Sequence, residues 1–158
     1  MGGVLALLAA AHYPVTAMVT LSAPYELPRD WRLGFLPVIK AVMPYANNES
    51  PQTEEEGKTE EHPAYQRVST RAADELKGLV KEMQVALPFI HVPALLLQAR
   101  HDGVIPPESM DSIYQRLGTP DKQEIWIESG GHVITLGPER QVAFAAIGQF
   151  VSRIAGTG

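Results

Sequence analysis

Helix-like and strand-like apolar segments alternate at the start of the chain. Residues 3–12 are apolar on nearly every face and precede Pro14, which predicts a buried helix that ends before the proline. The following segment is rich in β-branched residues and stops at Pro24, which predicts a buried strand over residues 15–23. A helix followed directly by a strand is half of a βαβ unit.

The same alternation resumes in the second half of the chain. Residues 92–99 are almost continuously apolar and predict a central parallel strand, which tolerates Pro93 near its start. Three more elements are predicted after it: a helix from Pro106-Pro107 to Gly118, a strand over residues 123–128, and a helix that begins at Gly137-Pro138. This order predicts the α/β class, with one parallel sheet flanked by helices.

Between these two regions the pattern is irregular. Prolines interrupt short apolar pieces, and an acidic stretch follows that is typical of a solvated surface. Apolar residues at steps of three and four then predict an amphipathic helix over residues 64–87, although Gly78 argues against its continuity. Insertions of this kind often serve as lids. We therefore predict a partial α/β core at 1–24 and 89–158, and an inserted cap at 25–88.

Composition and charge narrow the class of protein. With 158 residues and 45% hydrophobic content, the chain can bury one core and is neither disordered nor fibrous in type. The formal net charge of -5 and the absence of a Lys/Arg block argue against nucleic acid as a partner. No segment is long enough to span a bilayer, and the lack of cysteine makes the cytoplasm the default location. The histidines form no spaced cluster, so we expect neither a metal nor a cofactor.

Two candidate catalytic side chains follow the last two predicted strands. Asp102 lies where charge appears abruptly after residues 92–99, and His132 lies after the glycines of Gly130-Gly131-His132. A single helix separates the two strands, so we expect both side chains at the same carboxyl edge of the sheet. There a carboxylate can fix the imidazole tautomer while the second ring nitrogen takes a proton from a nucleophile. Taken singly, each residue is more typical of a turn.

Two further polar residues stand at strand ends. Ser22 is a weaker candidate nucleophile, because serines at strand ends usually satisfy local backbone groups and no glycine-flanked turn surrounds this one. Arg100 is expected to pair with a carboxylate of the cap or of a neighbouring loop, which is a structural role.

The second half of the chain also carries three longer motifs. They are Leu97-Gln98-Ala99-Arg100-His101-Asp102, Ile105-Pro106-Pro107-Glu108-Ser109 and Gly130-Gly131-His132-Val133-Ile134-Thr135-Leu136, accompanied by Tyr114. Together they resemble the carboxylesterase and monoacylglycerol-lipase-like branch of the α/β-hydrolases. The resemblance implies Asp102 as the acid and His132 as the base of a catalytic triad. It also implies a carboxylic ester hydrolase, a serine esterase or monoacylglycerol-lipase-like enzyme, whose substrate is a small carboxylic ester or an acylglycerol.

The first three residues, Met1-Gly2-Gly3, match the second half of that family's nucleophile elbow, Gly-Leu-Ser-Met-Gly-Gly. The resemblance implies that the nucleophilic serine precedes residue 1 and that the backbone of Met1 belongs to the oxyanion hole. We therefore expect a C-terminal portion of a longer hydrolase, without ordinary serine-esterase turnover on its own. Two alternatives stay open. One is a non-catalytic fragment that binds an apolar ligand or self-associates through exposed core surface. The other is a hydrolase of the same fold with an Asp or Cys nucleophile.

Overall fold

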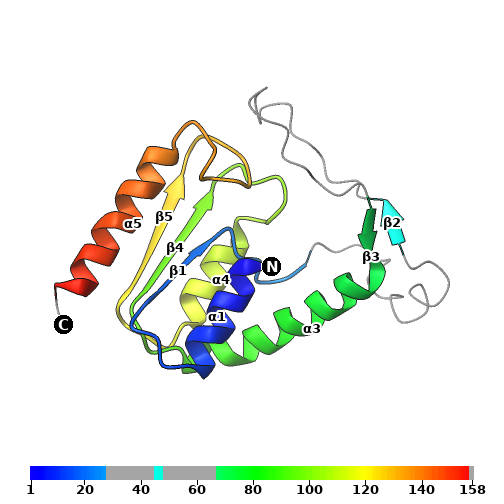
Figure 1. Ribbon diagram of the computed structural model, residues 1–158, viewed down its shortest axis with the longest axis horizontal. Helices are drawn as coiled ribbons and strands as arrows, with labels where there is room; N and C mark the ends of the chain where they lie inside the picture. The colour runs from blue at the N-terminus through cyan, green and yellow to red at the C-terminus, as the bar shows by residue number, and fades with distance from the viewer. Residues whose placement is uncertain (28–44, 48–66, 157–158) are drawn as a thin grey trace.

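The computed structural model describes residues 1–27, 45–47 and 67–156. Its core is a three-stranded parallel sheet in the order β1-β4-β5 (Figure 1), made of β1 (Met18–Leu21), β4 (Ala94–Ala99) and β5 (Lys122–Ile127). The helices are α1 (Gly2–His12), α3 (Thr70–Ala86), α4 (Glu108–Arg116) and α5 (Arg140–Ala155), with a short 3-10 helix, η2 (Leu87–Phe89). The predicted α/β class, a parallel sheet flanked by helices, is confirmed.

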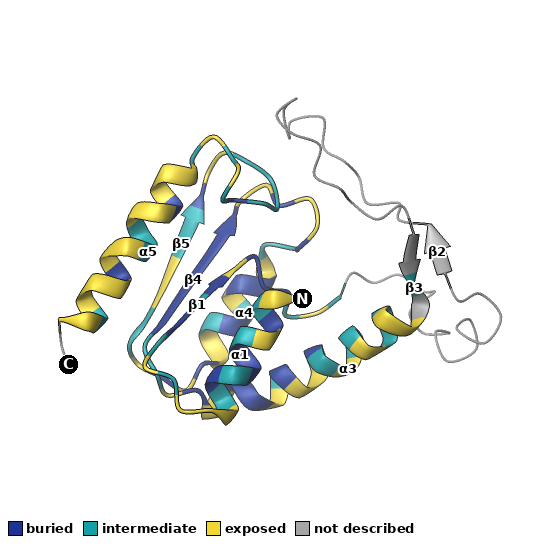
Figure 2. Cartoon of the chain, viewed as in Figure 1, coloured by how far each residue is buried: buried dark blue, intermediate teal, exposed yellow. Residues whose placement is uncertain are grey.

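Alternate side chains of β4 pack on opposite faces of the sheet. Ala94 and Leu96 belong to a core cluster with α1, α3 and α4, whereas Leu95 and Leu97 pack with the buried residues of α5. All six residues of β4 are buried, and Figure 2 shows this strand dark blue between two partly exposed neighbours. A strand covered on both faces must be apolar almost throughout, which is why this segment was readable from the sequence.

The register of the sheet brings the three carboxyl ends to one edge. Leu21 of β1 pairs with Leu97 of β4, and Ala99 of β4 pairs with Ile127 of β5. At the amino end of β5, the Nζ of Lys122 donates to two carbonyls at the end of α4. They are those of Tyr114 at 2.8 Å and Leu117 at 3.0 Å. The first residue of β5 therefore satisfies carbonyls that the end of that helix leaves without an intrahelical partner.

Helix α3 begins later than the sequence predicted. Residues 67–69 form the strand β3 (Arg67–Ser69), which pairs antiparallel with β2 (Tyr45–Asn47). The hydroxyl of Ser69 then accepts a hydrogen bond from the backbone N–H of Ala72 at 3.5 Å and caps the helix. The predicted start at residue 64 lies outside the described residues, and the predicted helical structure of 67–69 is wrong.

From its cap, α3 runs without interruption through Gly78, whose α-carbon faces open space. Its C-terminal half contributes the buried side chains of Val80 and Met83 to the same cluster as α1 (Figure 1). Most of the segment predicted to be a cap lies outside the described residues, so the division into core and cap stays a prediction. No helix within the described ranges is long and apolar enough to cross a membrane.

Candidate functional site

The carboxylate of Asp102 is buried and fully engaged by hydrogen bonds. Its Oδ1 accepts from the backbone N–H groups of Val104 at 2.8 Å and Ile105 at 2.9 Å. Its Oδ2 lies 2.9 Å from Nδ1 of His132, and the side chain of Asp102 has no exposed surface. Asp102 and His132, which the sequence predicted to meet at the carboxyl edge, are therefore in direct contact. The geometry suits an imidazole whose Nδ1–H donates to a carboxylate.

This environment has opposing effects on the acidity of Asp102. Burial alone raises the pKa of the carboxyl, because the charged form loses water. The hydrogen bonds from His132, Ile105 and Val104 favour the charged form and outweigh burial, so the pKa of Asp102 lies below its usual value. The carboxylate is thus held ionised and can stabilise a positive charge on the adjacent ring.

Gln98 supports the Asp102 loop, a role that was not predicted from the sequence. It lies on β4 with 1% of its surface exposed, and its Nε2 donates to the carbonyls of Ile105 at 3.0 Å and Pro106 at 3.1 Å. The amide therefore anchors the same short turn whose N–H groups bind Asp102. The available signal was an amide side chain within an otherwise apolar strand, since buried polar groups are normally hydrogen-bonded.

The loop that carries His132 is held at its start by Glu139. The Oε2 of Glu139 accepts from the backbone N–H groups of Glu128 at 3.0 Å and Ser129 at 3.2 Å, directly after β5. Gly130 then adopts a φ of 119°, a conformation that other residues rarely take. The side chain of His132 is 36% exposed, and its Nε2 has no hydrogen-bond partner among the described residues. That nitrogen is available to accept a proton.

Ser22, the weaker nucleophile candidate, lies in the same region with a different contact. Its backbone has a φ of 46°, which costs a non-glycine residue on the order of 1 kcal/mol. Its Oγ donates to the backbone carbonyl of His132 at 3.3 Å, and the residue is 6% exposed. The hydroxyl therefore bonds to the backbone of the histidine loop, 110 positions away in sequence, and not to the local backbone groups that we expected.

The beginning of α1 lies beside the end of β1. A Cβ atom placed on Gly3 would come within 2.6 Å of the Cβ of Ala23, so only glycine allows this approach. The carbonyl of Met1 accepts from the N–H groups of Val4 at 3.0 Å and Leu5 at 3.2 Å, and no side chain caps the helix. Figure 1 shows the N-terminus on the side of the sheet toward which the strands point. Free N–H groups at a helix start favour negative charge there.

Arg100, just after β4, forms a structural contact as expected. Its Nε lies 3.2 Å from both carboxylate oxygens of Glu128, and its guanidinium lies 4.4 Å from the ring centre of Trp126. The pairing carboxylate thus belongs to a neighbouring loop. The Arg100–Glu128 contact joins the end of β4 to the end of β5, the two strands whose following loops carry Asp102 and His132.

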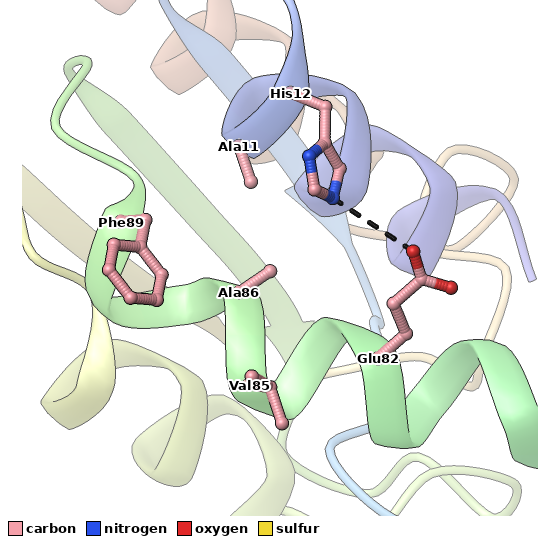
Figure 3. Close-up of a pocket in the computed structure, with 6 residues that line it drawn as sticks. All are labelled: Ala11, His12, Glu82, Val85, Ala86 and Phe89. Carbon is pink, nitrogen blue, oxygen red and sulfur yellow. Dashed lines mark ion pairs between the residues drawn. The ribbon is translucent and has the colours of Figure 1, made fainter.

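A cavity of about 610 Å³ lies away from this site, between α1, α3 and η2 (Figure 3). His12 of α1 and Glu82 of α3 face each other there at 3.9 Å. His12 ends a helix that begins near the strand carboxyl ends, and eleven residues of helix span about 16 Å. The cavity is therefore at the opposite end of α1 from Asp102 and His132. In the described ranges, no group of three or more potential ligand side chains is placed to hold a metal ion.

Comparison with known proteins identifies relatives over nearly the whole chain. The carboxylesterase of Bacillus subtilis (strain 168) is 29% identical over 160 residues, and the thermostable monoacylglycerol lipase of Bacillus sp. (strain H-257) is 25% identical over 162 residues. These matches cover 98% and 99% of this chain. The chain spans 61% of the length of each of these two relatives.

Solved structures share the fold. A structure from work on two metagenome-derived lipolytic enzymes, LipS and LipT, superposes with a TM-score of 0.85 at 23% identity, covering 97% of this chain and 62% of that one. The monoacylglycerol lipase of Paleococcus ferrophilus superposes with a TM-score of 0.78 at 18% identity, covering 95% and 65%. In addition, the sequence profile of a family described as serine aminopeptidase, S33, matches residues 1–139. The chain therefore belongs to this S33 family of α/β-hydrolases, as its resemblance to the esterase and monoacylglycerol-lipase branch indicated.

Proposed function

We propose that the chain carries the acid and the base of a carboxylic ester hydrolase, with Asp102 as the acid and His132 as the base. The observation that carries this proposal is the 2.9 Å contact between His132 Nδ1 and a buried carboxylate that is held by two backbone N–H groups. The relatives named carboxylesterase and monoacylglycerol lipase support carboxylic esters, small or of the acylglycerol type, as the substrate class. Residues 25–88 would shape the acyl pocket.

In the proposed reaction, a serine hydroxyl attacks the ester carbonyl and forms the Oγ–carbon bond. Its proton passes to Nε2 of His132, and Asp102 stabilises the resulting imidazolium. His132 then returns the proton to the alcohol oxygen as the ester C–O bond breaks. Water then attacks the acyl carbon while His132 takes its proton. The proton returns to the serine Oγ as the Oγ–carbon bond breaks and the carboxylic acid leaves. The backbone N–H at Met1 is proposed as one donor to the oxyanion, which forms on the carbonyl oxygen.

We further propose that these 158 residues do not turn over esters by themselves. In the described part of the chain, no serine hydroxyl is hydrogen-bonded to the ring of His132, and Ser22 donates to a backbone carbonyl instead. A burst of nitrophenol from a short-chain nitrophenyl ester, together with a covalent fluorophosphonate adduct, would contradict this proposal.

A chimaera tests the assignment of acid and base directly. The part of the Bacillus subtilis carboxylesterase that precedes its match to this chain is joined ahead of residue 1. We expect hydrolysis of nitrophenyl butyrate, and a fall in kcat of at least about a thousandfold on His132→Ala or Asp102→Asn. His101→Ala, beside Asp102 but exposed, is the matched control. Full activity of a folded His132→Ala chimaera would refute the proposed base.

Self-association is a second candidate function, favoured by a separate surface. In the described ranges β1 pairs only with β4, so its other edge has no strand partner. Val19 of the same strand lines a cavity of about 460 Å³. Its lining is mainly apolar and comes from the β1 region and α5: Thr16, Ala17, Val19, Phe150, Val151, Ile154 and Ala155. An unpaired edge next to apolar surface promotes contact between chains.

Sedimentation velocity over a concentration series tests this second candidate. We expect a concentration-dependent dimer that Val151→Glu weakens, because Val151 lines the cavity and is 53% exposed. Val142→Glu is the matched control, since Val142 is a comparably exposed valine of α5 outside the cavity. A chain that stays monomeric at the highest concentration would exclude self-association.

A further inference from the structure

We propose that Ser22 is a positioning residue for His132, which holds the backbone of the histidine while Asp102 holds its ring. This inference rests on the proposed function of His132 as the base. It gives Ser22 a role other than that of a nucleophile. It also assigns a function to a backbone conformation that is unusual within the described residues.

The backbone of Ser22 turns at the place where β1 ends. Its N–H still donates to the carbonyl of Leu97 at 2.8 Å, so the residue continues the hydrogen-bond ladder with β4. Its φ of 46° is the only positive value of a non-glycine residue in the described ranges. Because serine has no intrinsic preference for this region, another contact must compensate for it. The contact available is the hydrogen bond from its hydroxyl to the carbonyl of His132.

This hydrogen bond connects two loops that do not share a strand pair. β1 and β5 lie on opposite sides of β4, so the Ser22 hydroxyl reaches past the end of β4 to the loop that follows β5. The imidazole of His132 is then fixed at Nδ1 by Asp102, while its main chain is fixed at the carbonyl by Ser22. Two points of attachment restrict the rotation of the ring and keep Nε2 in one direction.

The residue after Ser22 extends this connection to α1. Ala23 packs against the α-carbon of Gly3, in a contact that leaves no space for a Cβ atom. The short segment Ser22-Ala23 therefore contacts the start of α1 on one side and the His132 loop on the other. It determines how far the start of the helix lies from the proposed base. In the resemblance described above, the nucleophile belongs next to that helix start.

Nuclear magnetic resonance of the histidine rings in the intact chain tests the proposal. The Nδ1 proton of His132 should appear as a downfield resonance that Asp102→Asn abolishes. We then compare two variants that both lack the hydroxyl. Ser22→Ala retains the unfavourable φ, whereas Ser22→Gly relieves it. Ser109→Ala is the matched control, because Ser109 is also buried but its hydroxyl has no partner in the described part of the structure.

We expect both Ser22 variants to increase the exchange of the His132 Nδ1 proton with water about fivefold, as the loss of one neutral hydrogen bond predicts. Ser109→Ala should leave that exchange unchanged. Wild-type exchange in both Ser22 variants would overturn the proposal. It would also be overturned if Ser22→Gly behaved like the wild type while Ser22→Ala did not, because backbone strain alone would then be responsible. Absence of the resonance in the unsubstituted chain would instead refute the Asp102–His132 pair.

Discussion

The loops that carry Asp102 and His132 are held in different ways. The Asp102 carboxylate is buried and its loop closes on itself, since the carboxylate binds two N–H groups of its own turn and Gln98 of the preceding strand binds two of that turn's carbonyls. The His132 loop is partly exposed and depends on residues from elsewhere, with Glu139 of the next helix at its start and Ser22 of another strand end at the histidine itself. The proposed acid is thus held by its own loop and the proposed base by its neighbours.

This difference agrees with the chemistry proposed for the two residues. An acid that only orients and stabilises its partner gains from complete immobility and exclusion of water. A base that exchanges protons with a substrate needs an accessible nitrogen, so the supports other than Asp102 contact the main chain of its loop and leave Nε2 free. We therefore expect substitutions at the Asp102 loop to affect global stability, and those around His132 to act locally.

Gln98→Leu should have the largest effect on folding. It removes the donor to two carbonyls, Ile105 and Pro106, from a buried position on β4. Loss of the Gln98 Oε1 atom, which has no partner in the described residues, offsets part of this cost. We expect the free energy of unfolding to fall by about 1–3 kcal/mol in urea titrations. Gln141→Leu, on the exposed surface of α5, is the control and should change it little.

Acidification should weaken the fold through Asp102. The pKa of its carboxyl is lowered in the folded chain, so the unfolded chain binds more protons around the usual value of about 4. The stabilisation from Asp102 is therefore complete above that pH and is lost as the pH falls through the folded pKa. Urea midpoints measured between neutral pH and about pH 3 should decline less in Asp102→Asn than in the wild type.

A second lowered pKa provides the comparison for that experiment. Asp121 pairs with Arg153 through two contacts, at 2.8 and 2.9 Å, and its hydrogen bond to the guanidinium lowers the pKa of its carboxyl. This pair is on the surface, where solvent and salt screen it. Added salt should reduce the contribution of Asp121 more than that of Asp102. Equal sensitivity to salt would contradict the contrast between a buried and an exposed carboxylate.

Glu139→Ala should have the smallest effect on global stability. The substitution removes the acceptor of the N–H groups of Glu128 and Ser129. Both lie in an exposed part of the loop, where water can replace the carboxylate. We expect a change below about 1 kcal/mol in the free energy of unfolding, with faster hydrogen exchange confined to those two amides. Exchange that accelerated equally at Val104 and Ile105 would show that the two loops are not independent.

The contact between Asp102 and His132 could be predicted because it depends only on topology. Two strands separated by one helix tend to be neighbours in a parallel sheet, and their carboxyl ends then meet at one edge. The hydrogen bonds that hold the two loops in place depend on the direction of individual side chains and on backbone dihedral angles. The hydrophobic periodicity of the sequence carries no information on either. Ser22 illustrates this limit, because neither its left-handed φ nor a partner 110 positions away leaves a local pattern. Gln98, in contrast, is marked by a local pattern, because it is the polar residue of an otherwise apolar strand.

The start of α3 was misplaced for a related reason. The sequence of residues 67–69 is compatible with the helical periodicity that follows, but these residues form a strand because they pair with β2. Ser69 then caps the helix. Residues 48–66 lie between the two strands in the sequence. Local periodicity cannot detect such a competitor, so the boundary moved while the helix itself was correctly predicted.

The ammonium group of Lys122 has a consequence for accuracy during folding. If β5 slipped by one residue along β4, every side chain of β5 would change faces, and His132 would shift by about 3.3 Å relative to Asp102. In the observed register Lys122 opposes Ala94, and its Nζ donates to the carbonyls of Tyr114 and Leu117. A single lysine at the amino end of β5 thus favours the register that brings His132 to Asp102 at the carboxyl ends of the strands.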